Sequence, residues 1–344
     1  MIYMNFDKSI IIENDIFNLF INENMKFTHL IMSKKFDHHL INGVKSCFSD
    51  IKFLKCYTKM DDNILAALIG ICKSIKELDL FINRNNNNYG IYKLIETPEK
   101  LVSVHLRSSI TVDQSFRKIL EMSLMKHAST IEYFKLNGLP ITKILLSFEN
   151  LKVLDLSYCY LIWKHLLNLS FPSLQILNSS LPIEFLQSII ENTSGSLTEI
   201  KFSGYLRNEV DSERFIQAIY QNCPKLKYLK LFIFSNNLLE LENLLIKCQY
   251  LNGLYVVINE KNFDWNKLFE ILTKSSPINL FKFKFCNCYQ LKLESLKLFF
   301  DNWKDRPPML LQLKHLKNMK VLLEKYKVMG KIKEYKFYLD ANFD

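Results

Sequence analysis

One spacing of apolar residues recurs along almost the whole chain of 344 residues. Two residues separate a first apolar residue from a second, and one residue separates the second from a third, as in Leu251/Leu254/Val256. Between positions 51 and 280 this pattern returns at a mean interval of about 25 residues. So regular an interval indicates repeated supersecondary units, each of which buries its apolar face only by stacking on its neighbours.

Between these motifs the apolar spacing changes to that of an amphipathic helix. Asp61 and Asp62 precede one such segment, Asp113 precedes another, and Asp211 lies at the start of a third. Acidic residues at a helix start suit both the capping position and the helix dipole. One strand and one helix per unit of this length is the leucine-rich-repeat pattern. We therefore predict an α/β leucine-rich-repeat solenoid, a horseshoe with parallel strands on its concave face and helices on its convex face.

The extent of the repeats predicts the domain organisation. We expect an N-terminal capping segment at 1–26, the solenoid at 27–305, and a C-terminal Lys-rich capping helix with an edge strand at 306–344. In the last segment, Met319 and Leu323 belong to one apolar helical stripe, which favours a cap that shields the final repeat. The alternative is a patch for an acidic partner or a membrane surface.

Some repeats carry a more specific pattern. The segment from Cys223 to Leu231 reads Cys-Pro-Lys-Leu-Lys-Tyr-Leu-Lys-Leu, which resembles the opening of cysteine-containing leucine-rich repeats. Cys159 and Cys288 follow two other copies, where that repeat type has Asn or Cys. Over roughly residues 20–310 the chain is similar to fungal F-box/leucine-rich-repeat proteins. That resemblance implies a substrate receptor of a Skp1–cullin–F-box (SCF) ubiquitin ligase.

The F-box itself is missing from this pattern. An F-box is a small helical unit that grips the Skp1 adaptor, and the segment from Ile12 to Phe20 resembles only its first helix. No Pro follows Ile12, and the repeats begin at Phe27, which leaves no room for the remaining helices. We expect either a relative without an F-box or a shortened form of a longer protein. The resemblance makes Skp1 and a cullin candidate partners, and the missing F-box puts their direct binding in doubt.

Glycine and charge bear on nucleotide and nucleic-acid binding. The chain has 8 glycines and neither G-x-G-x-x-G nor G-x-x-x-x-G-K-[ST], so a phosphate-cradling loop is not expected. The net charge is +10, but 39 of the 45 basic residues are Lys and only 6 are Arg. Arg is the side chain that forms bidentate contacts with phosphates and bases. We therefore expect no specific nucleic-acid partner, and a Lys-rich nucleic-acid-binding solenoid is the weaker alternative.

Metal, cofactor and catalytic motifs are missing from the sequence. The eight cysteines include no C-x-x-C, and we expect reduced, buried thiols. His38 and His39 are the only histidines close in sequence, and there is no H-E-x-x-H and no G-x-S-x-G. Asp61 and Asp62 are better explained as helix caps than as an acid–base pair. We expect no catalytic residue, no metal and no cofactor, and hence no enzyme.

The longest uncharged stretch, from Leu166 to Ile183, is interrupted by Pro172 and Pro182. Such a segment is a poor membrane span. A secretory leader has a cationic region followed by an apolar core, and the first residues of this sequence do not show that pattern. We expect a soluble monomer in the cytoplasm or nucleus, without a membrane partner.

Strand residues next to the buried anchors point to the concave face, because side chains alternate along a strand. Many of them are aromatic or charged, and Tyr, Phe and Arg are frequent energetic anchors in protein interfaces. The alternative is that they are ordinary solvated residues that support cross-strand packing. The candidate partner-binding residues on this face are Phe53, Tyr57, Phe81, Arg107, Tyr133, Lys135, Tyr228, Phe232 and Tyr255.

These observations favour a non-catalytic protein-interaction module. The resemblance implies the substrate-recognition part of an SCF-type ubiquitin ligase receptor, with a protein substrate held on the concave face. The first alternative is an interaction scaffold of the same fold that is unrelated to ubiquitination. The second is the Lys-rich nucleic-acid-binding solenoid.

Overall fold

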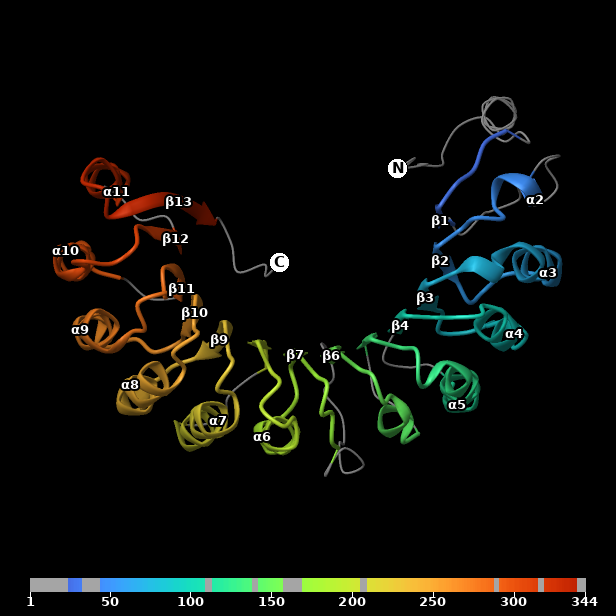
Figure 1. Ribbon diagram of the computed structural model, residues 1–344, viewed down its shortest axis with the longest axis horizontal. Coiled ribbons are helices and arrows are strands. Elements are labelled where there is room, and N and C mark those ends of the chain that lie inside the picture. The colour runs from blue at the N-terminus through green and yellow to red at the C-terminus, as the bar shows by residue number, and fades with distance from the viewer. Residues whose placement is uncertain are drawn as a thin grey trace. The chain divides into compact units, whose positions relative to one another are not determined.

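The computed structural model describes residues 24–32, 44–108, 113–137, 142–156, 169–204, 209–287, 291–314 and 319–338. The chain divides into two compact units, Met1–His165 and Leu166–Asp344, and each is described by itself. In both units, short parallel strands stack in chain order and the helices lie on one side of them (Figure 1). The predicted α/β leucine-rich-repeat solenoid is thus confirmed. The domain boundaries at residues 27 and 305 stay predictions, and the F-box-like segment from Ile12 to Phe20 lies outside the described residues.

The first unit contains six described strands, each paired in parallel with the next along the chain. The strands are β1 (His29–Ile31), β2 (Phe53–Tyr57), β3 (Glu77–Ile82), β4 (Ser103–Ser108), β5 (Tyr133–Asn137) and β6 (Val153–Leu156). The helices are α2 (Val44–Cys47), α3 (Asp62–Ile71), α4 (Ile91–Glu96) and α5 (Gln114–Ser123), with short 3-10 helices at Cys72–Ser74, Leu124–His127 and Ile144–Ser147.

The second unit contains seven described strands with the same parallel order. The strands are β7 (Ile176–Ser179), β8 (Glu199–Phe202), β9 (Tyr228–Phe232), β10 (Gly253–Ile258), β11 (Lys282–Asn287), β12 (Met309–Lys314) and β13 (Ile332–Tyr338). The helices are α6 (Ile183–Glu191), α7 (Glu209–Asn222), α8 (Leu238–Lys247), α9 (Trp265–Ser275), α10 (Leu293–Asn302) and α11 (Met319–Val328), with a 3-10 helix at Ser235–Asn237.

The repeated anchors set the strand register. In the first unit Leu54 pairs with Leu78, which in turn pairs with Val104, so equivalent positions of successive repeats lie side by side. All three side chains are buried toward the helices. Because side chains alternate along a strand, the residues between the anchors point to the opposite side. The apolar pattern therefore fixes both the core and the residues of the open side.

The acidic residues before the predicted helices act as caps. An Asp61 carboxylate oxygen accepts a hydrogen bond from the Ile64 amide at 2.8 Å, and Asp113 accepts one from the Ser115 amide at 3.0 Å. Both bonds satisfy amides that have no partner within the helix. Asp211 lies within the first turn of α7, where its charge suits the helix dipole.

The structure contains one strand that the apolar spacing did not indicate. The pattern passes from Leu280 directly to Ile332, but β12 lies between them. Phe283 pairs with Leu311, so the position equivalent to Leu280 is occupied by Pro308. Because this first anchor is a proline and not a large aliphatic residue, the repeat lacks the apolar pattern that marks the others.

The described cysteines are buried, as expected. Their relative exposures are 0% for five of them and 6% for the sixth; they are Cys47, Cys56, Cys72, Cys223, Cys248 and Cys286. Burial raises the pKa of Cys72 and Cys248 to about 12. These two thiols are therefore protonated and unreactive at neutral pH. Cys159 and Cys288 lie outside the described residues.

Candidate functional site

The side of the strands away from the helices is called here the open strand face. All nine predicted partner-binding residues lie at strand positions that point to this face, and each is partly or fully exposed. Their roles in binding stay predictions. In the first unit they are Phe53, Tyr57, Phe81, Arg107, Tyr133 and Lys135, and in the second unit Tyr228, Phe232 and Tyr255.

In the first unit the open strand face is organised around Asp79 on β3. Its side chain is buried, and Arg107 donates two hydrogen bonds to its carboxylate, each 2.8 Å long. Lys55 Nζ approaches the same carboxylate at 4.0 Å and His105 Nδ1 at 3.6 Å. The predicted anchor Arg107 is therefore engaged within the protein. Strand alternation places Asp79 on the concave face, but it was not selected as a candidate residue, and its pairing with Arg107 was not predicted.

His105 lies beside this carboxylate on β4. Burial lowers its pKa from the ordinary 6.5 to about 4, and the nearby cations Arg107 and Lys135 act in the same direction. The negative charge of Asp79 opposes these effects without overcoming them. The imidazole is consequently neutral at physiological pH, and Asp79 is balanced by Arg107 and Lys55 instead.

The other predicted residues of the first unit are also in contact with neighbours. The rings of Tyr57 and Phe81 lie 5.1 Å apart, and Lys135 Nζ is 3.0 Å from a carboxylate oxygen of Asp155. Burial raises the pKa of Tyr133, with the charge of Asp155 as a second cause. These contacts agree with the alternative interpretation, in which such residues support the strands by packing and ion pairing.

In the second unit the register aligns two rows of residues across six strands. One row consists of the residues just before the second anchor, namely Glu199, Tyr228, Gly253, Lys282, Leu310 and Glu334. The other consists of the residues between the second and third anchors, and we call it the lysine row. Its members are Lys201, Lys230, Tyr255, Lys284, Gln312 and Lys336.

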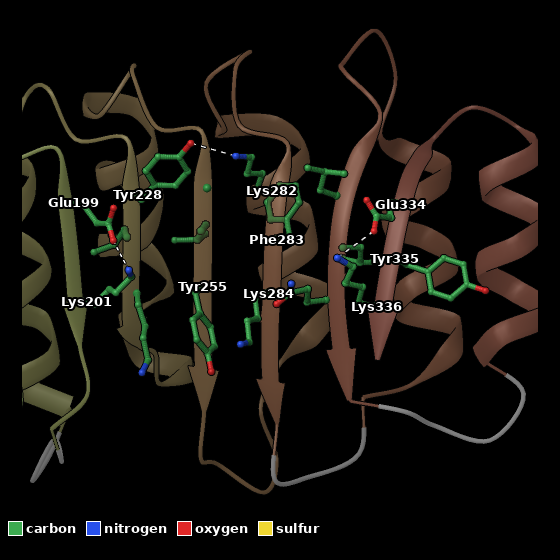
Figure 2. Close-up of a pocket in the computed structure, with 17 residues that line it drawn as sticks. Glu199, Lys201, Tyr228, Tyr255, Lys282, Phe283, Lys284, Glu334, Tyr335 and Lys336 are labelled. Atoms are coloured by element: carbon green, nitrogen blue, oxygen red, sulfur yellow. Dashed lines mark hydrogen bonds and ion pairs between the residues drawn. The ribbon is translucent and has the colours of Figure 1, made fainter. Parts of the chain in front are cut away.

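The first row contains a contact across an intervening strand. Lys282 Nζ donates a hydrogen bond to the Tyr228 hydroxyl at 3.2 Å and lies 5.1 Å from the centre of the Tyr228 ring (Figure 2). Gly253 stands between the two residues on β10. Because Gly253 has no side chain, the tyrosine and the lysine meet above it.

The lysine row contains a tyrosine ring with two cations. Lys230 Nζ lies 5.2 Å and Lys284 Nζ 4.6 Å from the centre of the Tyr255 ring. Lys230 is only 5% exposed, and its ammonium donates a hydrogen bond to Ser203 Oγ at 2.8 Å. The pKa of Lys230 is lowered from the ordinary 10.5 to about 8, first by burial and second by the charge of Lys284.

These two rows line a depression of about 480 Å³ on the open strand face (Figure 2). Its charged lining consists of five lysines and two glutamates. Both glutamates form ion pairs with lysines two residues further along the same strand: Glu199 with Lys201, and Glu334 with Lys336 at 3.3 Å. The other three lysines of the lining, Lys230, Lys282 and Lys284, lie between these pairs on β9 and β11.

Two of the three predicted binding residues of this unit line the depression, and the third does not. Tyr228 and Tyr255 both line the depression, whereas Phe232 packs against Phe202 with ring centres 5.8 Å apart. Sequence reasoning did not select Lys282 or Lys284, which lie beside the two tyrosines. Strand alternation already places both lysines on the concave face, but their contacts with the tyrosines become visible only when the repeats are aligned on their anchors.

Neither a metal-binding cluster nor a membrane-spanning helix occurs within the described ranges. No group of three or more His, Cys, Asp or Glu side chains there is placed to hold a metal ion. No helix there is long and apolar enough to cross a membrane.

Comparisons with known proteins show a likeness to solved structures. No protein-family model matches the chain, and no curated protein matches it. Among solved structures, the leucine-rich-repeat-containing protein LegL7 from Legionella pneumophila is similar to it, with 17% sequence identity and a TM-score of 0.43. The likeness covers 75% of this chain and 81% of LegL7.

Proposed function

We propose that the chain is a non-catalytic protein-interaction module that holds a partner protein on its open strand face. The observation that carries this proposal is the depression over β8–β13, where tyrosines and lysines from five of the six strands converge. Partly exposed tyrosines supply a large contact area at little entropic cost, and such residues dominate binding energy in protein interfaces.

A pair of matched variants tests this proposal. The face variant carries Tyr228→Ala and Phe232→Ala. The control carries Ile246→Ala on α8 and Tyr250→Ala in the turn after it, and both of these residues are exposed. The unaltered chain and both variants are used for affinity purification, and partners are identified and quantified by mass spectrometry. We expect the face variant to lose partners that the control retains. Equal recovery by both variants would exclude the open strand face as the binding surface.

The finer proposal is that this module recruits substrates to an SCF-type ubiquitin ligase in the cytoplasm or nucleus. Support comes from the cysteine-containing repeats, in which Cys223 and Cys248 are fully buried directly after α7 and α8. The Cys248 thiol donates a weak hydrogen bond to the Cys223 carbonyl at 3.9 Å, which links successive repeats.

Co-expression with Skp1 and a cullin tests this setting directly. Recovery of both proteins with the chain supports the ligase proposal. Their reproducible absence favours a scaffold that is unrelated to ubiquitination, and the protein-interaction proposal then stands without the ligase.

A further inference from the structure

We propose that the depression over β8–β13 binds an acidic, extended segment of the partner protein, whose carboxylates pair with Lys282 and with the lysine row. This inference rests on the proposed protein-interaction function and specifies the chemistry of the partner. Three features of the described residues support it: the charge balance of the lining, the crowding of cations around Tyr255, and the spacing of the lysines across the strands.

The charge of the lining favours an anionic ligand. Five lysines and two glutamates line the depression, and the glutamates stand on its two outer strands, β8 and β13. Their ion pairs with Lys201 and Lys336 are at the surface, with exposed fractions of 53% and 68% for the two lysine side chains. Exposed pairs of this kind contribute little to stability, so a carboxylate of the partner can replace them at low cost.

The cations around Tyr255 repel each other. Lys230 and Lys284 approach the same ring from the two neighbouring strands, and the charge of Lys284 acts against protonation of Lys230. A carboxylate placed beside both ammonium groups would reduce this repulsion. It would also form charge-assisted hydrogen bonds, which are stronger than neutral ones. The site therefore gains more from an anion than an isolated surface lysine would.

The spacing of the lysine row suggests the conformation of the bound segment. Lys230, Lys284 and Lys336 stand on β9, β11 and β13, so successive members are two strands apart. Two strand separations amount to about 9.6 Å. Three residues of polyproline II advance about 9.3 Å, so an acidic side chain at every third position would meet successive lysines. An extended peptide lying across the strands fits this arrangement.

The same features disfavour a nucleic acid. Single strands bind by stacking bases on open aromatic faces. Here ammonium groups lie over the rings of Tyr228 and Tyr255. The lining contains lysines and no arginine, so it lacks the forked donor that suits phosphates and bases. Glu199 and Glu334 on the outer strands would repel a phosphate backbone that continued beyond the depression.

The experiment uses the full chain and a fluorescein-labelled peptide of Glu-Pro-Pro repeats, about twelve residues long, which adopts polyproline II. Binding is followed by fluorescence anisotropy at low and physiological salt. We expect the corresponding Gln-Pro-Pro peptide to bind at least roughly tenfold more weakly, because it lacks the carboxylates. Equal binding of the two peptides would overturn the proposal.

Three variants locate the binding site. Lys282→Gln combined with Lys284→Gln should weaken binding of the acidic peptide roughly tenfold or more. Lys284→Arg keeps the positive charge and should therefore retain binding of the acidic peptide. The matched control is Lys247→Gln on α8, which removes a lysine that also lies over a tyrosine ring, 5.0 Å from the centre of Tyr220, but on the helix side. An equal loss in the control and the double variant would assign binding to net charge and overturn the proposal.

A labelled oligothymidylate of similar length tests the other class of polymer. If it binds more tightly than the acidic peptide and loses affinity in the double lysine variant, the site belongs to a nucleic acid and the proposal fails. The peptide experiments can fail independently of the affinity purification that tests the protein-interaction function. If Tyr228 and Phe232 prove necessary for partner recovery while the acidic peptide does not bind, the acidic chemistry is wrong and the protein-interaction function stands.

Discussion

Lys282 and Tyr228 are hydrogen-bonded at 3.2 Å although they stand on β11 and β9, with β10 between them. Gly253 on β10 is the register partner of both residues. A Cβ atom at this glycine would lie 2.7 Å from Tyr228 Cδ1 and 3.4 Å from Lys282 Cβ. The missing side chain is therefore what allows the tyrosine ring to occupy the space over β10 and reach the lysine.

The first prediction follows from this close approach. Gly253→Ala should displace the Tyr228 ring, because an added methyl group cannot lie 2.7 Å from a ring carbon. Overpacking destabilises the folded state by about 1–3 kcal/mol. Replacing a flexible glycine stabilises the protein by up to about 1 kcal/mol, because the unfolded chain loses conformational freedom. We expect a net loss of about 1 kcal/mol in the free energy of unfolding, measured by urea denaturation.

A double-mutant cycle isolates the cause. In a Tyr228→Ala background the clash is gone, so Gly253→Ala should become neutral or stabilising. If Gly253→Ala destabilises both backgrounds equally, the close approach of the ring is not the reason for the glycine.

The second prediction concerns the buried carboxylate of Asp79. Asp79→Asn should destabilise the chain by about 2–3 kcal/mol, because it removes the charge that holds Arg107 and leaves Arg107 and Lys55 without their counter-ion. The control is Glu77→Gln on the same strand, which neutralises an exposed carboxylate and should change the free energy of unfolding by less than about 0.5 kcal/mol. Equal effects of the two substitutions would show that Asp79 contributes only general charge.

The third prediction is a loss of stability in mild acid. The pKa of His105 is about 4 in the folded protein, below its ordinary 6.5, so the unfolded chain binds the proton more readily. Stability should therefore be full above pH 6.5 and fall as the pH decreases toward 4. The size of the effect is of the order of 1–3 kcal/mol. His127, whose pKa burial also lowers, contributes in the same direction.

The measurement is urea denaturation across this pH range for the unaltered chain and for His105→Gln. The variant has no group that titrates at position 105, so its stability should fall less steeply between neutral pH and pH 4. Parallel curves for the two proteins would mean that His105 is not protonated on unfolding.

The elements that sequence analysis located are those that depend on local chemistry. The strands were found because each repeat carries its own buried anchors, such as Leu54 and Leu254. The helix starts at Asp61 and Asp113 were found because the capping side chain bonds to an amide only two or three residues away. Both signals lie within one repeat and need no knowledge of its neighbours.

The interactions that it missed join different repeats. Asp79 and Arg107 are 28 residues apart in sequence, and their pairing depends on the register of β3 and β4. The role of Gly253 likewise requires both flanking strands. The sequence alone does not reveal which of its oppositely charged residues are in contact. Aligning the repeats shows which residues lie side by side on neighbouring strands. The aromatic residues were chosen one by one, and the lysine row is visible only when the repeats are stacked.

The last prediction concerns the link between the final repeats. Arg306, which follows α10, donates hydrogen bonds to the carbonyls of Ser276 at 2.9 Å, Pro277 at 3.2 Å and Thr273 at 3.3 Å. Its guanidinium carbon also lies 4.9 Å from the centre of the Trp303 ring. These carbonyls belong to the C-terminal end of α9 and the residues after it, where a helix has no internal donors for its last carbonyl groups. One arginine therefore joins α9 to the segment that leads into β12.

Arg306→Ala should lower the free energy of unfolding by about 2 kcal/mol, because it leaves part-buried carbonyl groups without donors. Arg306→Lys should restore less than half of this loss, since a single ammonium group cannot span the three carbonyls as the planar guanidinium does. Lys304→Ala, two residues away and exposed, serves as the control and should have little effect on urea denaturation. Full restoration by lysine would reduce the role of Arg306 to its positive charge, and the geometry of the fork would then be irrelevant to how the last repeats are joined.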